Sequence, residues 1–133
     1  MPRSFHVLII ESDTDALVQM RRVLAGMGGS AITAVDENTL EKASGYLQAK
    51  RLAPALIVAR VTLPTGSGIR LLEEAAQSFP GARHLLISHH PQHLLMMVPG
   101  FADHCGHFLQ EVFSDEQFRA AVEESLASTL RSE

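Results

Sequence analysis

The sequence predicts an α/β fold in which five parallel strands form one sheet covered by helices on both faces. Two observations lead to this prediction. Short apolar, β-branched runs alternate five times with longer amphipathic segments. The runs also lack a polar face, as expected for strands buried on both sides of a parallel sheet. Because crossover connections are right-handed, few topologies remain, and a doubly wound sheet of order 2-1-3-4-5 suits this length best.

Strands are expected at residues 5–10, 31–35, 55–61, 84–88 and 104–109. Ser12 to Asp15 supply N-cap chemistry for a first helix that Gly28-Gly29 ends. Leu40, Ala43 and Leu47 mark a second helix, and a third continues to Pro80-Gly81. A short fourth helix is expected at residues 91–98. The last helix opens with the capping box formed by Ser114 and Gln117.

Length and composition favour one domain over residues 1–133, with a core of about residues 4–130. The net charge of −4 gives no electrostatic drive toward nucleic acid or an anionic membrane. A single Cys excludes an internal disulfide. No apolar run approaches the roughly 18 residues of a spanning helix, and the start does not resemble a signal peptide. A soluble cytoplasmic protein is therefore expected.

Polar residues follow the strands at the edge where open α/β sheets bind ligands, outside the carboxyl ends of the strands. They come from four of the five expected strands and should converge near the switch point between the first and third. They are Glu11, Ser12, Asp13, Arg60, Thr62, Ser88, Gln110 and Glu111.

Four segments carry a resemblance to a known family: VLIIESDTD, LIVARVTLPTGSGIRLLEE, LLISHH and HFLQEVFSDEQF. Together they resemble the receiver domains of two-component response regulators over essentially the whole chain. The most specific stretch is residues 63–68, Leu-Pro-Thr-Gly-Ser-Gly, which is similar to the family's Met-Pro-x-x-Asp-Gly turn. The resemblance implies a flavodoxin-like fold of receiver type and a role in signal transduction.

The resemblance also implies a phosphorylation pocket, and most of its positions are changed here. Receivers hold Mg²⁺ with two acids after the first strand and phosphorylate an Asp that ends the third. A hydroxyl ends the fourth strand, a Lys follows the fifth, and an aromatic in the fifth switches rotamer. The matching positions are Glu11 and Ser12 with Asp13 next to them, Arg60 for the phosphoacceptor, Ser88 for the hydroxyl, Glu111 for the Lys and Phe108 for the aromatic.

Arg60 cannot be a phosphoryl acceptor, because a guanidinium carries no acceptor atom and does not deprotonate in proteins. It would also repel Mg²⁺, and Glu111 would repel a phosphoryl group. We therefore expect a pseudo-receiver with no catalytic residues, no cofactor and no bound metal. Arg60 is expected to pair with Glu111, Glu11 or both, the alternative being that its head points to solvent. Val112 replaces the family's Pro, which makes a cis peptide after Glu111 improbable and predicts a different loop path.

The apolar block at residues 94–98 is expected to lie mostly in the core. In receivers, helix four, strand five and helix five form a face for dimers and output contacts. The resemblance therefore implies a protein partner or a homodimer through Leu95, Met96, Met97 and the neighbourhood of Phe108. Two alternatives remain: an anion or small-molecule sensor using Arg60 and Ser88, and the receiver portion of a longer regulator.

Other chemistries fit the sequence less well. His89, His90 and His93 follow the fourth strand, whereas His104, Cys105 and His107 begin the fifth, so the two groups lie a strand length apart and predict no zinc site. The sequence contains no nucleophile elbow that would make Ser88 or Ser12 a hydrolase nucleophile. Acidic residues after the first strand have the wrong sign for a flavin phosphate.

Overall fold

The computed structural model describes residues 4–131, with side chains through residue 127. Its central sheet has five parallel strands in the order β2-β1-β3-β6-β7, as predicted. A two-stranded hairpin, β4-β5, lies between the third strand and the helix that follows it. The strands are β1 (Phe5–Ile10), β2 (Gly29–Ala34), β3 (Leu56–Arg60), β4 (Thr62–Leu63), β5 (Gly66–Ser67), β6 (Arg83–Ser88) and β7 (His107–Gln110).

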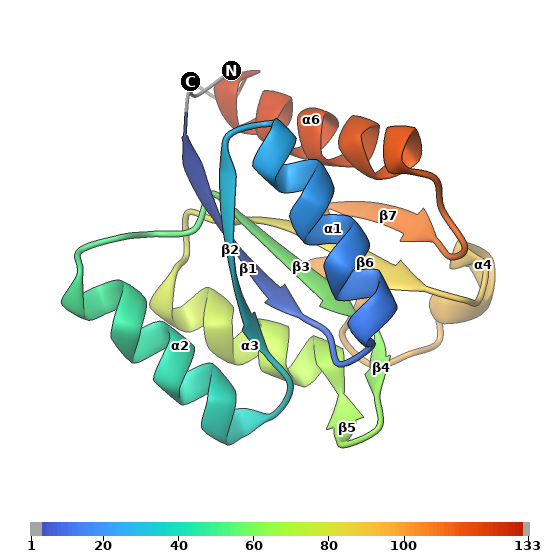
Figure 1. Cartoon of the computed structure of the whole chain (residues 1–133). Helices are drawn as coiled ribbons and strands as arrows, with labels where there is room; N and C mark the ends of the chain where they lie inside the picture. The colour runs from blue at the N-terminus through green and yellow to red at the C-terminus, as the bar shows by residue number, and fades with distance from the viewer. Residues whose placement is uncertain (1–3, 132–133) are drawn as a thin grey trace.

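Helices cover both faces of the sheet (Figure 1). They are α1 (Thr14–Gly26), α2 (Glu37–Ala49), α3 (Gly68–Ser78), α4 (Gln92–Leu95), α5 (Phe101–His104) and α6 (Asp115–Arg131). Val7 and Ile9 of β1 face the cluster that α1 and α6 bury, and Leu8 and Ile10 face the cluster of α2 and α3. This alternation produces two cores, one on each side of a fully buried strand.

The stretch between β6 and β7 differs from the expectation of one helix and a long strand. The helix expected at residues 91–98 is a single turn, α4. Residues 101–104 form a second turn, α5, which was not expected, and the strand expected from residue 104 begins only at His107. Pro99 cannot donate a backbone hydrogen bond, and Gly100 adopts the left-handed conformation with φ of +83°. These two residues separate the helical turns and shorten β7 to four residues.

The expectation that the apolar block 94–98 lies mostly in the core is wrong. Leu95 is 5% exposed, whereas Leu94, Met96 and Met97 are 57%, 52% and 89% exposed. Successive residues of one helical turn point about 100° apart, so a single turn can direct only one of them into the core. Leu95 occupies that position, in the same cluster as Phe101.

Gly68 fixes the path of the chain between β3 and α3. A Cβ at this position would lie 1.6 Å from the carbonyl oxygen of Arg60. The Gly68 N–H also donates to the carbonyl of Val61 at 3.0 Å. The start of α3 therefore packs directly on the backbone of Arg60, which only glycine permits. This contact holds the end of β3 in place.

Within the described part of the chain, residues 4–131, no helix combines the length and the apolar character needed to cross a membrane.

Candidate functional site

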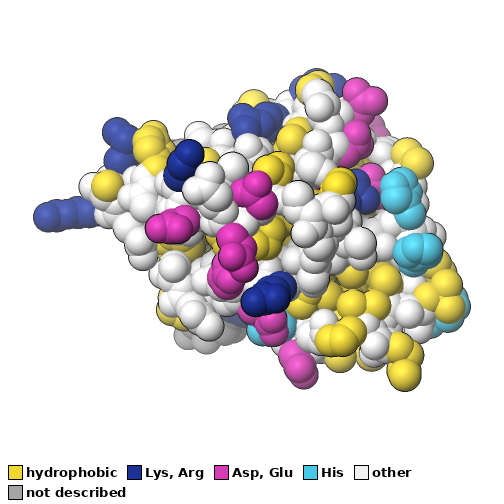
Figure 2. Space-filling view, turned by 90° about the horizontal axis from the view of Figure 1, so that it is seen from below, with side chains coloured by type: hydrophobic (Ala, Val, Ile, Leu, Met, Phe, Trp, Pro, Cys, Tyr) yellow, Lys and Arg dark blue, Asp and Glu magenta, His cyan; other side chains and the backbone are white. Residues whose placement is uncertain are grey.

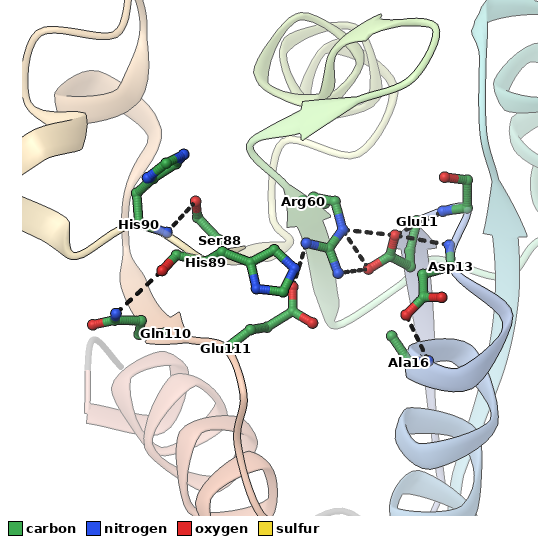
Figure 3. Close-up of polar contacts among 10 residues, drawn as sticks. Glu11, Asp13, Ala16, Arg60, Ser88, His89, His90, Gln110 and Glu111 are labelled. Carbon is green, nitrogen blue, oxygen red and sulfur yellow. Dashed lines mark hydrogen bonds and ion pairs between the residues drawn. The ribbon is translucent and has the colours of Figure 1, made fainter.

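The polar residues predicted to converge do share the carboxyl edge of the sheet. Arg60 pairs in register with Ile87, and Ser88 pairs with Gln110. Glu11 directly follows β1, and its N–H donates to the carbonyl of Ala34 at the end of β2. Figure 3 shows Arg60 at the centre of this edge, with Glu11 on one side and Glu111 on the other.

Glu11 is a fully buried carboxylate, with 0% of its side chain exposed. The Nε–H of Arg60 donates to its two oxygens at 2.7 and 2.8 Å, and Nη2 lies 2.6 Å from Oε1. Oε2 also accepts from the backbone N–H groups of Ser12 at 2.8 Å and Asp13 at 3.0 Å. A buried charge is tolerated when a partner and hydrogen bonds compensate its desolvation, and both are present here.

Arg60 uses its remaining terminal nitrogen for the second acid. Nη1 pairs with Oε1 of Glu111, and the side chains of Arg60 and Glu111 are 11% and 10% exposed. The prediction that Arg60 pairs with Glu111, Glu11 or both is confirmed, since it pairs with both, and the alternative of a solvated head is wrong. Burial lowers the pKa of the Arg60 guanidinium, but hydrogen bonds to the two carboxylates outweigh burial and raise this pKa above its ordinary value.

The loop after β7 contradicts one expectation. The Glu111–Val112 peptide is cis although residue 112 is not proline. Along this path the Glu111 carboxylate reaches Arg60. The N–H of Glu111 donates to the carbonyl of Ser88 at 2.8 Å, which extends the β6-β7 pairing by one residue and keeps Glu111 at the sheet edge.

Three other predicted pocket residues have different partners. The Asp13 carboxylate accepts from the N–H of Ala16 at 3.2 Å and caps α1. The Ser12 side chain is exposed, while its backbone binds Glu11. Ser88 is buried, and its hydroxyl accepts from the N–H of His90 at 3.1 Å. None of these three side chains is bonded to Arg60 within residues 4–127.

The hydrogen bonds from the main chain to Glu11 were not predicted from the sequence. Glu11 lies two residues before Asp13, the N-cap of α1, and its carboxylate accepts from the N–H groups of Ser12 and of Asp13 itself, both of which precede the first turn of the helix. The cap signal was visible in the sequence and could have indicated this. Gln110 was placed at the edge, and its amide donates to the carbonyl of His89 at 3.2 Å rather than to the ionic cluster.

Phe108, at the predicted switch position, is half-buried and packs edge to face on Phe101 with centroids 5.9 Å apart. Leu95 is buried in the same cluster, whereas Met96 and Met97 are exposed. Figure 2 shows the molecule from below. Hydrophobic side chains gather over one part of the face seen in this view, with His side chains beside them.

Among residues 4–127, no three His, Cys, Asp or Glu side chains are placed to hold a metal ion. His89 and His90 are exposed at the carboxyl end of β6. His104 lies at the other end of the sheet, where its Nε2 is 3.0 Å from Glu73 and its carbonyl is 3.1 Å from Nδ1 of His84.

Comparison with solved structures identifies the fold. A signal receiver domain of an HD domain-containing protein from Pseudomonas fluorescens Pf-5 is 18% identical, with a TM-score of 0.75 over 99% of this chain and 93% of that one. A CheY-like response regulator receiver domain from Methanospirillum hungatei JF-1 is 19% identical, with a TM-score of 0.75 over 98% and 99%. The PhyR response regulator REC domain of Erythrobacter litoralis is 22% identical, with a TM-score of 0.76 over 93% and 91%.

The chain therefore has the fold of receiver domains. No protein-family model and no curated protein sequence matches it.

Replacing Arg60 with Met is predicted to reduce the free energy of unfolding by about 3–5 kcal/mol, because Glu11 would remain buried without its cation. Urea unfolding measures this change. The matched control is Arg22→Met, which removes an exposed pair with Asp115 whose side chains are 60% and 45% exposed. That control should cost at most about 1 kcal/mol. Equal, small losses in both variants would contradict a supporting role for Arg60.

Proposed function

We propose that this chain is a receiver-like signalling module of a bacterial two-component or phosphorelay system that accepts no phosphoryl group and acts through protein contacts. The observation that carries the proposal is the position of Arg60. It ends β3 at the sheet edge, where the receiver pattern has its phosphoacceptor Asp, and it is neutralised by Glu11 and Glu111. These residues therefore supply no step of a phosphorylation cycle, because Arg60 cannot accept a phosphoryl group and Glu111 would repel one.

The side chains at this edge do not fit the Mg²⁺ that receivers use. Both oxygens of Glu11 already accept hydrogen bonds from Arg60, and Oε2 accepts two more from the main chain. Asp13 caps α1, and a guanidinium occupies the place of a third ligand. Mg²⁺ requires oxygen ligands at about 2.0–2.1 Å in near-octahedral geometry. To bind the Glu11 carboxylate, it would therefore have to displace Arg60 from that carboxylate.

The geometry also argues against the anion-sensor alternative. Arg60 directs Nε and Nη2 at Glu11 and Nη1 at Glu111, so each of its three nitrogens already contacts a carboxylate. Two carboxylates around one guanidinium leave a net negative charge, which disfavours an incoming anion. The oxygen of Ser88, the expected second anion contact, accepts a hydrogen bond from the backbone N–H of His90.

The contact surface of this module is proposed to be the exposed part of α4 and the residues next to it. Leu94, Met96 and Met97 are largely exposed, with Leu95 anchoring the turn beneath them and Phe108 packed nearby. Met side chains adapt readily to different partners, and contiguous exposed apolar residues commonly mark interaction sites. A homodimer or another protein partner through this face would supply the output.

The proposal predicts that a two-dimensional NMR titration with Mg²⁺ and beryllofluoride produces no saturable shifts at Glu11, Asp13 or Ser88. A triple variant, Ser12→Asp with Arg60→Asp and Glu111→Lys, recreates the receiver pattern and serves as the control for the titration. Saturable shifts in the wild-type protein at these three positions would contradict the proposal.

A homodimer through α4 predicts that the weight-average mass in sedimentation equilibrium rises with protein concentration. Met97→Glu should abolish the rise, because it places a charge in the centre of the contact. Val18→Glu is the matched control, since Val18 is 55% exposed on α1, on the opposite side of the sheet. A wild-type mass that stays monomeric, or equal effects of both variants, would rule out this dimer.

A further inference from the structure

The loop that carries Glu111 joins β7 to α6 and depends on only a few contacts to fix its path. The bond from the Glu111 N–H to the Ser88 carbonyl is the last of the β6-β7 pairing, and α6 begins at Asp115. Val112 between them is 91% exposed. Because a charge-assisted hydrogen bond weakens steeply with distance and angle, something must hold this loop for Glu111 to meet Arg60.

The holding contact comes from α1, on the other side of the loop. The Nε2 of Gln19 donates to the carbonyl of Phe113 at 3.0 Å and to Oδ1 of Asp115 at 3.1 Å. Both partners are acceptors, so only the NH₂ side of the amide satisfies them. One side chain thereby bonds the loop backbone and the first residue of α6 at once.

Phe113 is anchored a second time through its ring. It is 4% exposed and stacks on Phe118 with centroids 5.7 Å apart. Gln19 holds the carbonyl of the same residue, so the backbone is fixed two residues beyond Glu111. The short distance along the chain leaves little freedom between this anchor and the carboxylate that pairs with Arg60.

The two halves of the ionic cluster depend on different supports. Glu11 is held by β1 and by the N–H groups of Ser12 and Asp13, none of which belongs to the loop. Glu111 alone reaches Arg60 from the loop that Gln19 clamps. Loss of the Gln19 amide should therefore loosen one half of the cluster and leave the other intact.

We propose that Gln19 is a positioning residue that holds Glu111 against Arg60 by clamping the Phe113 carbonyl and Asp115. The inference rests on the proposed function, in which the Arg60 bridge takes the place of phosphorylation. It assigns Gln19 of α1 a role at the pocket although this side chain bonds the loop and Asp115 rather than the ionic cluster.

A triple-mutant comparison tests this role. Unfolding equilibrium constants are measured for Arg60→Met, Glu111→Gln and their combination, first in the wild-type background and then with Gln19→Leu. The Arg60–Glu111 coupling is expected to be about tenfold in the wild-type background and to fall close to unity with Gln19→Leu. The Arg60–Glu11 coupling, measured with Glu11→Gln, should be unchanged. Arg22→Met, which frees Asp115 from Arg22 but spares the Phe113 carbonyl, should leave both couplings intact.

A purely structural Gln19 would lower stability without changing the Arg60–Glu111 coupling, and that result overturns the inference. A coupling near unity in the wild-type background overturns it as well, because Gln19 would have nothing to position. Should a combined variant fail to fold, nitrogen-15 NMR of Arg60 in Gln19→Leu alone decides: faster rotation of Nη1 supports the role, and unchanged rotation refutes it. Beryllofluoride binding by the wild-type protein would refute the proposed function. The Arg60–Glu111 couplings with and without Gln19→Leu could still be measured and interpreted in that case.

Discussion

A mostly buried guanidinium that cannot lose its charge is the constraint on which this edge of the molecule depends. Arg60 ends a strand whose other residues are fully buried, so its head must find compensation within the fold. Glu11 provides a two-oxygen contact and Glu111 a second carboxylate. Removing water from such charges costs several kcal/mol for each charge. The close ion pairs and hydrogen bonds between Arg60 and the two carboxylates offset that cost.

The same interaction joins parts of the chain that are far apart in sequence. Arg60 connects the carboxyl ends of β1 and β3 to the loop after β7, and the main chain at the start of α1 completes the shell around Glu11. In a phosphorylatable receiver these elements would surround a metal and a phosphoryl group. In this structure Arg60 and the two carboxylates place opposite charges in direct contact at the same edge.

The parts of this structure that follow from local pattern could be predicted from the sequence. Alternation and crossover handedness left few topologies, and the strand order was chosen among them as the one that best suited the length. The partners of Arg60 could be named because few charges reach that edge. The single turns α4 and α5 could not be resolved, because an apolar run before Pro99 looks equally like a longer helix. The cis peptide at Val112 lacks any local sequence signal. The bond from Gln19 to Phe113 spans 94 residues, and only the packing of α1 against α6 creates it.

The central claim is that Arg60 bridges Glu11 and Glu111 and excludes metal and phosphoryl chemistry. A high-resolution crystal structure grown in Mg²⁺ and beryllofluoride tests this claim most directly. The account predicts the guanidinium between the two carboxylates, with no electron density for Mg²⁺ or beryllofluoride beside it. Density for Mg²⁺ on Glu11, with Arg60 turned out toward solvent, would contradict it.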